Sequence, residues 1–388
     1  MPDVLVIGGG IIGAACASEF ARRGAEVTLV ERDELAAHAS GRNQGLWILP
    51  EDEATVAMAQ LSLERYVEVA EQAPLDVQLD PEPIGQILLA RDDAERVTAR
   101  TAVELAEREG VRVDRLDAAA LAEAEPAITG EVADAWLVHS GHRLDPGALT
   151  VALALDARAH GATVRHHLHA RALTRQSDRI VGAVTDDGVI EAATTVIAGG
   201  PWSSKLLDPA GVSLPVTGAR GWLVRLSAPP VPIRHLVRAE PPVGHRQGLA
   251  PDHPRVSEIL QDGMPTGAVA TVLLPHRDGS LLVGSSRQIW LTPEPDGSDV
   301  VSRMLAEAVR LVPSLREADV LSTWWGVRPL SPDERPFVGP VLDGLAVATG
   351  HGSEGVILGA GTASLLAAQL AGEDPPFDPG PFAPRRFG

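Results

Sequence analysis

The sequence of 388 residues contains a single cysteine, Cys16, and a single lysine, Lys205. With one cysteine, no disulfide can form within the chain, and a metal site built from cysteines is excluded. We predict no metal ligands in this sequence. A chain without disulfides fits a reducing compartment, so a cytoplasmic location is expected.

Long hydrophobic runs are also missing. No stretch reaches the roughly 18 apolar residues that a membrane-spanning helix requires, so no membrane span is expected. The chain carries 33 lysine and arginine residues against 52 aspartate and glutamate residues, a net charge of −19. This charge argues against nucleic acids and anionic membrane surfaces as partners. The length predicts at least two domains.

The N-terminal residues have the pattern of a complete strand–helix–strand unit. Val4 to Ile7 is a short apolar run typical of a buried parallel strand. Ala14 to Arg23 has helical spacing, and Val27 to Val30 predicts the next strand. Gly8-Gly9-Gly10-Ile11-Ile12-Gly13 follows the first strand directly, with its glycines in the register that binds a pyrophosphate.

Three glycines and one acid in this unit predict the ligand. Gly8 permits the tight turn, Gly10 lets the backbone approach a pyrophosphate, and Gly13 lets the helix pack closely on the strand. The pyrophosphate would lie at the helix N-terminus, where free N–H groups and the helix dipole favour an anion. Glu31, at the end of the second strand, can accept hydrogen bonds from a ribose diol and would repel a 2′-phosphate. The expected ligand is FAD or NAD, not NADP.

Two other interpretations of this unit explain less. An ordinary glycine-rich turn leaves Glu31 without a reason. A signal peptide or membrane anchor fails because polar residues interrupt the apolar stretch and no basic leader precedes it.

Later segments predict two interleaved domains. Asp145-Pro146 is typical of a helix start, with Asp as N-cap and Pro in the first turn. Asp186-Asp187-Gly188 predicts a hairpin turn, and the middle of the chain is rich in predicted strands. We expect a nucleotide-binding domain from residues 1–50, 144–215 and 322–388, and a substrate domain from residues 51–143 and 216–321. The proline-rich segment from Ala228 to Pro265 predicts either a functional lid or a mobile loop.

Seven spaced motifs follow one another along nearly the whole chain. They are the opening unit with Glu31-Arg32, the loop from Ala39 to Gly45, Leu144-Asp145-Pro146, the segment from Val196 to Ser203, Pro215 to Arg225 with Arg220-Gly221, Trp325 to Asp333, and Gly350 to Val356. In this order they resemble the FAD-dependent D-amino-acid oxidase superfamily, which includes glycine oxidase, sarcosine oxidase, D-amino-acid dehydrogenase and opine-oxidase-like enzymes. The resemblance implies an α/β fold in which a Rossmann-type FAD-binding domain is interleaved with an α+β substrate domain built on an antiparallel sheet.

The resemblance also implies a set of cofactor-binding residues. They are Gly8, Gly10, Ile12, Gly13, Glu31, Arg32, Ser40, Arg42, Asn43, Gln44, Gly45, Ala170, Gly199, Trp202, Gly326, Arg328, Gly352, Ser353, Glu354, Gly355 and Val356. By resemblance the segment from Gly350 to Gly355 lies beside the isoalloxazine, where a helix N-terminus stabilises the charge of a reduced flavin. The alternative is a well-capped helix without a ligand. FAD is expected to be non-covalent, because relatives with a covalent flavin use a cysteine in the C-terminal half and Cys16 lies near the N-terminus.

Two residues are predicted to be catalytic. In relatives, an arginine at the position of Arg328 holds the substrate carboxylate, which a guanidinium fork matches in a bidentate manner. The alternative is a salt bridge from Arg328 to Asp333 or Glu334. His351 is expected near the flavin, where it could orient the substrate or tune proton release.

Two further residues are predicted to contact the substrate besides Arg328 and His351. Trp47 is expected to form a cavity wall, with plain core as the equal alternative. Glu354 stands where relatives commonly have a small or neutral residue, so it either recognises a substrate amine or faces solvent. Glu334 replaces the usual glycine of a Pro-Asp-Gly-x-Pro turn, and Gln288 stands where relatives often carry an acid.

The resemblance implies oxidation of the C–N bond of an amino acid or a related small amine that carries a carboxylate. Hydride would move to flavin N5, and water would then hydrolyse the imine. The electron acceptor is either dioxygen or a partner, because Lys205 is expected to be solvated, away from the place where relatives use a lysine to activate oxygen. The alternatives are a dehydrogenase subunit that passes electrons to a protein or quinone, a non-catalytic flavin-binding assembly factor, and a biosynthetic oxidase for an unusual amino acid.

Overall fold

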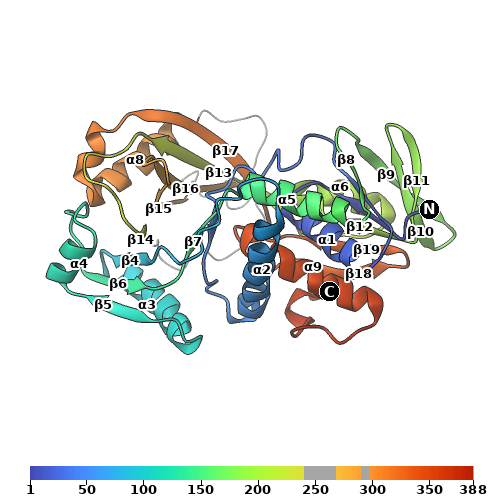
Figure 1. Ribbon diagram of the computed structural model, residues 1–388, viewed down its shortest axis with the longest axis horizontal. Helices are drawn as coiled ribbons and strands as arrows, with labels where there is room; N and C mark the ends of the chain where they lie inside the picture. Colours follow the sequence, from blue (N-terminus) through green and yellow to red (C-terminus); the bar gives the residue numbers. More distant parts are fainter. Residues whose placement is uncertain (240–267, 290–296, 388) are drawn as a thin grey trace, which may run out of the picture.

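The structure is a computed structural model, and it describes residues 1–239, 268–289 and 297–387. The predicted insertion from Ala228 to Pro265 therefore lies outside the described residues from residue 240 onward. Figure 1 shows an elongated molecule in which one sheet occupies each end and α2 (Glu53–Gln72) lies between them. Within the part of the chain that is described, no helix combines the length and the hydropathy needed to cross a bilayer.

The first sheet has six strands around the predicted strand–helix–strand unit. Its order is β18 (Phe337–Leu342), β19 (Leu345–Thr349), β12 (Thr194–Ile197), β1 (Val4–Ile7), β2 (Val27–Val30) and β8 (Thr163–Arg165). All neighbours are parallel except β18 and β19. The glycine loop leaves β1 where the chain order of the strands reverses, which is where α/β sheets bind nucleotides.

Alternate residues of β1 enter two different cores. Val4 and Val6 pack under α1 (Ile11–Arg22), α5 (Pro146–Ala159) and α9 (Gly355–Ala371). Leu5 and Ile7 face the opposite side, which is covered by the small sheet β11 (Gly188–Glu191), β10 (Arg179–Thr185) and β9 (Ala170–Gln176), together with α6 (Ser203–Leu207). A strand that is apolar at every position is therefore buried on both faces, as parallel strands usually are.

The second sheet has eight strands. Its order is β17 (Val320–Leu330), β13 (Thr217–Leu226), β16 (Leu281–Ile289), β15 (Ala268–Pro275), β14 (Leu236–Ala239), β4 (Gln86–Ala90), β6 (Asp134–Val138) and β5 (Val113–Leu116). Every pair is antiparallel except β14 with β4. The expected antiparallel sheet is thus mixed, because β4 and β14 come from separate chain segments and are not joined by a hairpin.

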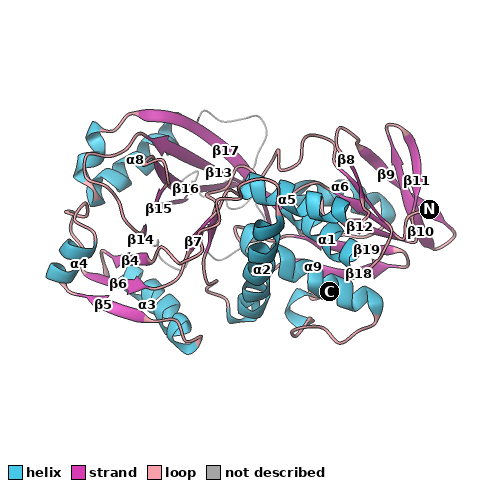
Figure 2. Cartoon of the chain, in the orientation of Figure 1, coloured by secondary structure: helices cyan, strands magenta, loops and turns pink. Residues whose placement is uncertain are grey.

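Helices and short elements complete the second lobe (Figure 2). The helix α8 (Ser298–Leu311) packs on one face of the sheet, and α3 (Asp93–Arg108) packs on strands near the other end. The remaining elements of the described residues, taken over both lobes, are α4 (Ala118–Ala124), the two-stranded pair β3 (Leu46–Trp47) and β7 (His142–Arg143), and 3-10 turns at Gly200–Trp202, Asp208–Ala210, Pro313–Glu317 and Gly380–Phe382.

Two segments lie in a different lobe from the one expected. The helix α2 was predicted within the substrate domain (51–143), but Met58, Ala59 and Tyr66 are part of the core under α1, α5 and α9. The strand β17 pairs with β13 along its whole length up to Leu330, whereas the nucleotide domain was expected to resume at residue 322. Amphipathic spacing shows that an element has a buried side, but it does not show which core that side enters.

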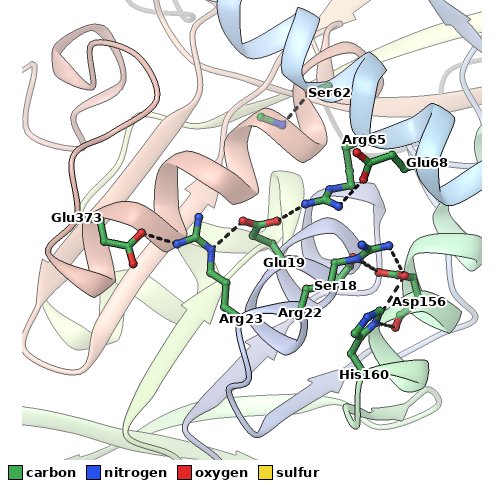
Figure 3. A network of polar contacts seen from close by, with 11 residues as sticks. Ser18, Glu19, Arg22, Arg23, Ser62, Arg65, Glu68, Asp156, His160 and Glu373 are labelled. Atoms are coloured by element: carbon green, nitrogen blue, oxygen red, sulfur yellow. Dashed lines mark hydrogen bonds and ion pairs between the residues drawn. The ribbon is translucent and has the colours of Figure 1, made fainter.

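A polar network ties α1 to the helices around it (Figure 3). Asp156 on α5 accepts hydrogen bonds from Arg22 Nε at 2.7 Å and Nη2 at 2.6 Å, and also from the Ser18 hydroxyl. Glu19 joins Arg23 at 2.8 Å to Arg65 of α2 at 3.3 Å. The network holds the helix that carries the glycine loop against its neighbours.

Candidate flavin pocket and adjoining cavity

The glycine loop has the close contacts that its residue types predict. Gly8 has a φ of +119°, and a Cβ atom at this position would overlap the carbonyl of Ala198. A Cβ atom on Gly13 would overlap the carbonyl of Gly8, so only glycine lets α1 begin this close to β1. The start of α1 therefore stays open for an anion.

Glu31 and Ser40 hold this loop in place. Glu31 is 9% exposed and accepts hydrogen bonds from Gly9 N at 2.6 Å and Asp33 N at 2.9 Å. Ser40 Oγ accepts a hydrogen bond from Ile11 N, the first amide of α1, at 2.9 Å. Glu31 was predicted as a ribose ligand, and it also braces the loop that would contact the pyrophosphate.

An aromatic platform stands at the same end of the pocket. The Arg32 guanidinium lies 4.0 Å from the centre of the Trp202 ring, and the His38 ring lies 4.6 Å from it. Asp33 accepts hydrogen bonds from His38 at 2.7 Å and Arg32 at 3.0 Å, and these bonds hold the pKa of Asp33 below its usual value. A flat ring with a guanidinium and an imidazole beside it suits the adenine and ribose of a dinucleotide.

These elements line a pocket of about 250 Å³. The predicted cofactor residues that line it are Gly8, Gly10, Ile12, Glu31, Arg32, Ser40, Asn43, Ala170, Gly199, Trp202, Arg328, Gly352, Ser353, Gly355 and Val356. Their donors, glycines and apolar walls fit FAD at two helix N-termini, that of α1 and that of α9. Nothing in the donor set conflicts with this cofactor.

The start of α9 forms the second helix N-terminus. Its N-cap, Glu354, makes no side-chain capping bond to the helix. The preceding turn is fastened to the end of β17, since Gly352 N donates to Pro329 O at 2.8 Å and Leu330 forms a β-bridge with His351. The end of β17, which carries Arg328, is therefore hydrogen-bonded to the turn at His351 and Gly352 that lines the flavin pocket.

His351 in this turn is buried against α9 and α2. It is 2% exposed, and its Nε2 lies 3.0 Å from Thr362 Oγ1 on α9, which lies 3.2 Å from Met58 Sδ on α2. Burial lowers the pKa of His351 to about 3, so the imidazole is neutral. His351 lines the flavin pocket, its Nε2 is bonded to Thr362 on α9, and its expected part in orienting the substrate stays a prediction.

A second cavity, also of about 250 Å³, adjoins the flavin pocket. The two share Ala39, Asn43, Arg328, Ser353 and Val356. Its walls combine apolar side chains from β3, β13 and β15 (Leu46, Leu223 and Val272) with several charged ones. A small molecule in this cavity would lie directly beside a ligand in the flavin pocket.

Arg328 stands at the boundary between the two spaces. Its Nη1 donates to Ser286 O at 2.9 Å. Burial, and next the positive charge of Arg287, lower the pKa of Arg328 to about 10, so the side chain remains charged at neutral pH. Within residues 1–239, 268–289 and 297–387, no carboxylate forms an ion pair with it. A buried cation in this situation favours an anionic ligand.

The two acids proposed as alternative partners of Arg328 bind other arginines. Asp333 pairs with Arg386 at 2.8 Å, and Glu334 pairs with Arg287. Glu334 has a φ of +60°, the left-handed conformation that favours glycine. The ion pair to Arg287 gives a physical reason for a glutamate at this position, which the sequence alone did not supply.

Several predicted cofactor residues lie elsewhere. Arg42, Gln44, Gly326 and Glu354 line the second cavity and not the flavin pocket, and their contact with the cofactor stays a prediction. Gly13 and Gly45 line neither space. Of the predicted substrate residues, Glu354 lines the second cavity, but Trp47 is core: it is 5% exposed and donates to Ala59 O at 3.1 Å.

Other residues of the two spaces were not predicted. Lys205 is exposed and lines the flavin pocket together with Trp202, but it does not line the second cavity. Arg238 is 8% exposed and lines the second cavity, where it pairs with Glu51 at 2.9 Å. A lone arginine in an apolar strand, as in Leu236–Ala239, is a signal that could have identified Arg238.

The chain is similar to known proteins along nearly its whole length. A family model described as FAD dependent oxidoreductase matches residues 3–369. Glycine oxidase of Pseudomonas putida is 26% identical over 393 residues, which cover 98% of each chain. The crystal structure of glycine oxidase from Geobacillus kaustophilus has a TM-score of 0.83 at 26% identity and 98% coverage of both chains. L-Proline dehydrogenase from P. horikoshii has a TM-score of 0.82 at 22% identity, covering 99% of this chain and 97% of its own, and shares the fold.

Proposed function

This chain belongs to the family of FAD-dependent oxidoreductases, and from that premise we propose that it oxidises the C–N bond of an amino acid or a related amine that carries a carboxylate. Glycine oxidase is similar to it over the whole chain in both sequence and structure. The observation that carries the substrate class is Arg328, a buried guanidinium without a carboxylate partner among the described residues, at the junction of the flavin pocket and the second cavity.

The protein's own part in the reaction is to bind and to orient. Arg328 would hold the substrate carboxylate with two parallel hydrogen bonds, which fixes the neighbouring carbon against the flavin pocket. The apolar walls of the cavity, Leu223 and Val272 among them, would exclude water from that carbon. When bound, FAD supplies the hydride acceptor.

Two of the three glutamates that line the second cavity form ion pairs, Glu51 with Arg238 and Glu334 with Arg287, and we assign no proton transfer to them or to Glu354. His351 is buried and neutral, and its Nε2 is bonded to Thr362. The substrate amine would therefore bind in its neutral form, and hydride loss would need no proton abstraction by the protein. Hydrolysis of the resulting imine would follow in water.

The electron acceptor is the second part of the proposal. Lys205, the single lysine of the chain, lines the flavin pocket near Trp202 and not the substrate cavity. The chain therefore places no lysine where the two spaces meet, which favours a dehydrogenase with a protein or quinone acceptor over an oxidase. A reducing compartment remains a prediction from the single, buried Cys16.

The decisive experiment is anaerobic reduction of the purified flavoprotein by matched pairs of amines. Glycine, sarcosine, proline and both hands of larger amino acids are compared with the same amines without the carboxylate, such as pyrrolidine for proline. We expect the visible flavin absorbance to fall with at least one amino acid and not with its carboxylate-free partner. Equal bleaching by both would reject carboxylate recognition, and no bleaching at all would favour a non-catalytic flavin protein.

The acceptor is tested on the reduced protein. Rapid turnover with an artificial dye, together with slow reoxidation in air, would support the dehydrogenase. Reoxidation in air as fast as turnover would establish an oxidase.

A further inference from the structure

Three side chains that the function does not use meet at the end of the sheet near the flavin pocket. Glu34 follows β2, and His166 and His167 follow β8, the neighbouring parallel strand in which Arg165 pairs with Val30. Glu34 Oε2 lies 3.1 Å from His166 Nδ1, and Glu34 Oε1 lies 2.8 Å from His167 Nε2. All three side chains are exposed, between 48% and 66%.

The geometry suits a single cation. The ligand atoms of the three residues lie within 4.8 Å of one another. Around one zinc ion with bonds of about 2.0–2.1 Å, ligand atoms lie about 3.0–3.4 Å apart. The two imidazoles now approach different oxygens of Glu34, so the three groups would draw together from within 4.8 Å to share one ion. The same nitrogens that now approach the carboxylate could bind an ion after a small movement of each ring.

The residue types narrow the choice of ion. Two imidazoles and one carboxylate are a common ligand set for zinc and similar transition metals, whereas magnesium and calcium prefer oxygen ligands throughout. Exposure leaves the remaining coordination positions to water. Because the ion would be exposed to solvent and bound by both loops, its expected role is to hold the two loops together.

The loops that carry the cluster also shape the flavin pocket. Leu168 N donates to Glu31 O at 2.8 Å, and His167 N donates to Asp33 O at 3.2 Å, so the two loops already run side by side. Glu31, Leu168 and Ala170 line the pocket. An ion between Glu34 and the two histidines would add a third tie between these loops.

We propose that Glu34, His166 and His167 form a binding site for a divalent transition-metal ion of the zinc class, and that the bound ion fastens the two loops at the adenosine end of the flavin pocket. No metal ligands were expected from the sequence, in which 131 residues lie between Glu34 and His166. The pairing of β2 with β8 brings them together.

The test uses the flavoprotein without a histidine tag, stripped with a chelator and titrated with zinc chloride against a chelating indicator. We expect one zinc ion per chain in the wild type. Glu34→Gln and His167→Ala should each weaken binding about tenfold or more, because each removes one of three protein ligands. His139→Ala is the matched control: His139 also pairs with a single acid, Asp114, at 2.7 Å, in the other lobe.

The outcomes separate clearly. Zinc binding that is weakened by His167→Ala and unchanged by His139→Ala would support the site. Wild-type protein that binds zinc no more tightly than Glu34→Gln and His167→Ala would overturn it, as would binding that none of these variants alters.

The effect on the pocket has its own readout, the rate at which FAD leaves the protein on dilution. Zinc should slow FAD release in the wild type and leave the rate in His167→Ala unchanged, because only the wild type gains the extra tie. Zinc that binds at this cluster without slowing FAD release would overturn the role as a fastener.

Discussion

The guanidinium of Arg328 occupies the space in which a side chain at position 221 would begin. A Cβ atom on Gly221 would overlap Nη1 of Arg328. The two residues come from neighbouring strands, since Gly221 on β13 pairs with Gly326 on β17 and Arg328 lies two positions further along β17. The position of the proposed substrate arginine therefore depends on a glycine in the adjacent strand.

Gly221→Ala should displace Arg328 without removing it. We expect the KM for amino-acid substrates to rise about tenfold to a hundredfold, a loss of about 1.4–3 kcal/mol of binding, with FAD content unchanged. Steady-state kinetics measure the KM, and the flavin-to-protein ratio measures the FAD content. Gly110→Ala is the control: the space around Gly110 is open, and its φ of +76° means that an alanine there strains the backbone far from the site. An unchanged KM in Gly221→Ala would contradict the importance of this contact.

Arg328→Lys should keep a positive charge and lose the fork that matches a carboxylate. We expect kcat/KM to fall at least about a hundredfold, since lysine cannot form two parallel hydrogen bonds, while FAD remains bound. Arg225→Lys is the control. Arg225 lies in the same sheet, on β13, and pairs with Asp278 at 2.6 Å, so its replacement should leave kcat/KM near the wild-type value. Equal losses in both variants would point to a general effect on the sheet.

Replacing His351 should change the pH dependence of stability and leave the pH dependence of catalysis unchanged. The pKa of His351 is lowered to about 3 in the folded protein by burial, against about 6.5 in an unfolded chain. The unfolded state therefore binds more protons between these values, and stability falls as the pH falls. Between pH 7 and 5, wild type should lose about 2 kcal/mol more stability than His351→Gln. Denaturant unfolding at both pH values measures the difference.

Two further results bear on His351. The pH profile of kcat/KM in Thr362→Val should keep the wild-type inflections, because the imidazole stays neutral throughout the working range. A catalytic ionisation between pH 5 and 8 that disappears in His351→Gln would show that the residue acts on the substrate after all.

Asp156→Ala should destabilise the protein. Burial raises the pKa of Asp156, but hydrogen bonds from Arg22 and Ser18 outweigh it and hold the pKa below its usual value. Because the folded-state pKa is lowered, the contribution is present above the pKa of an unfolded aspartate and is lost as the pH falls below it. We expect a loss of about 2 kcal/mol at pH 7 that shrinks in acid, measured by unfolding.

Asp343→Ala provides the comparison for Asp156. Asp343 forms an exposed pair with Arg179, and its loss should change stability by less than about 0.5 kcal/mol. Similar losses of stability in Asp156→Ala and Asp343→Ala would mean that the polar network around α1 contributes little to the stability of the protein.

Local features of the fold could be predicted because contiguous residues determine them. The expected strand from Val4 to Ile7, the glycine loop and the next strand are confirmed. Asp145 caps α5 by accepting from Ala148 N at 2.9 Å, as its position before Pro146 indicated. The hairpin turn at Asp186-Asp187-Gly188 joins β10 and β11. Turn and cap preferences act within a few residues, so they are visible in sequence.

Side-chain environments were harder to predict. Trp47 and Trp202 look alike as single aromatic residues after a loop, yet one is core and the other lines the flavin pocket. His351 follows a strand next to the pocket, but its ring turns to Thr362. Which way such a side chain points depends on the packing of α9 and α2, elements that lie far from it along the chain.

The order of residues by itself determined the dinucleotide loop and the acid after the second strand, and the resemblance that its motifs carry pointed to Arg328. The loop and the acid depend on neighbours along the chain, where backbone geometry and hydrogen-bonding preferences act directly. Only the folded molecule decided that Arg328 lacks an acidic partner among the described residues, that Glu334 pairs with Arg287, and that Glu34 meets two histidines. These contacts join residues that are far apart in the sequence. Which side chains are buried, and which charges pair, is decided only when distant segments pack together.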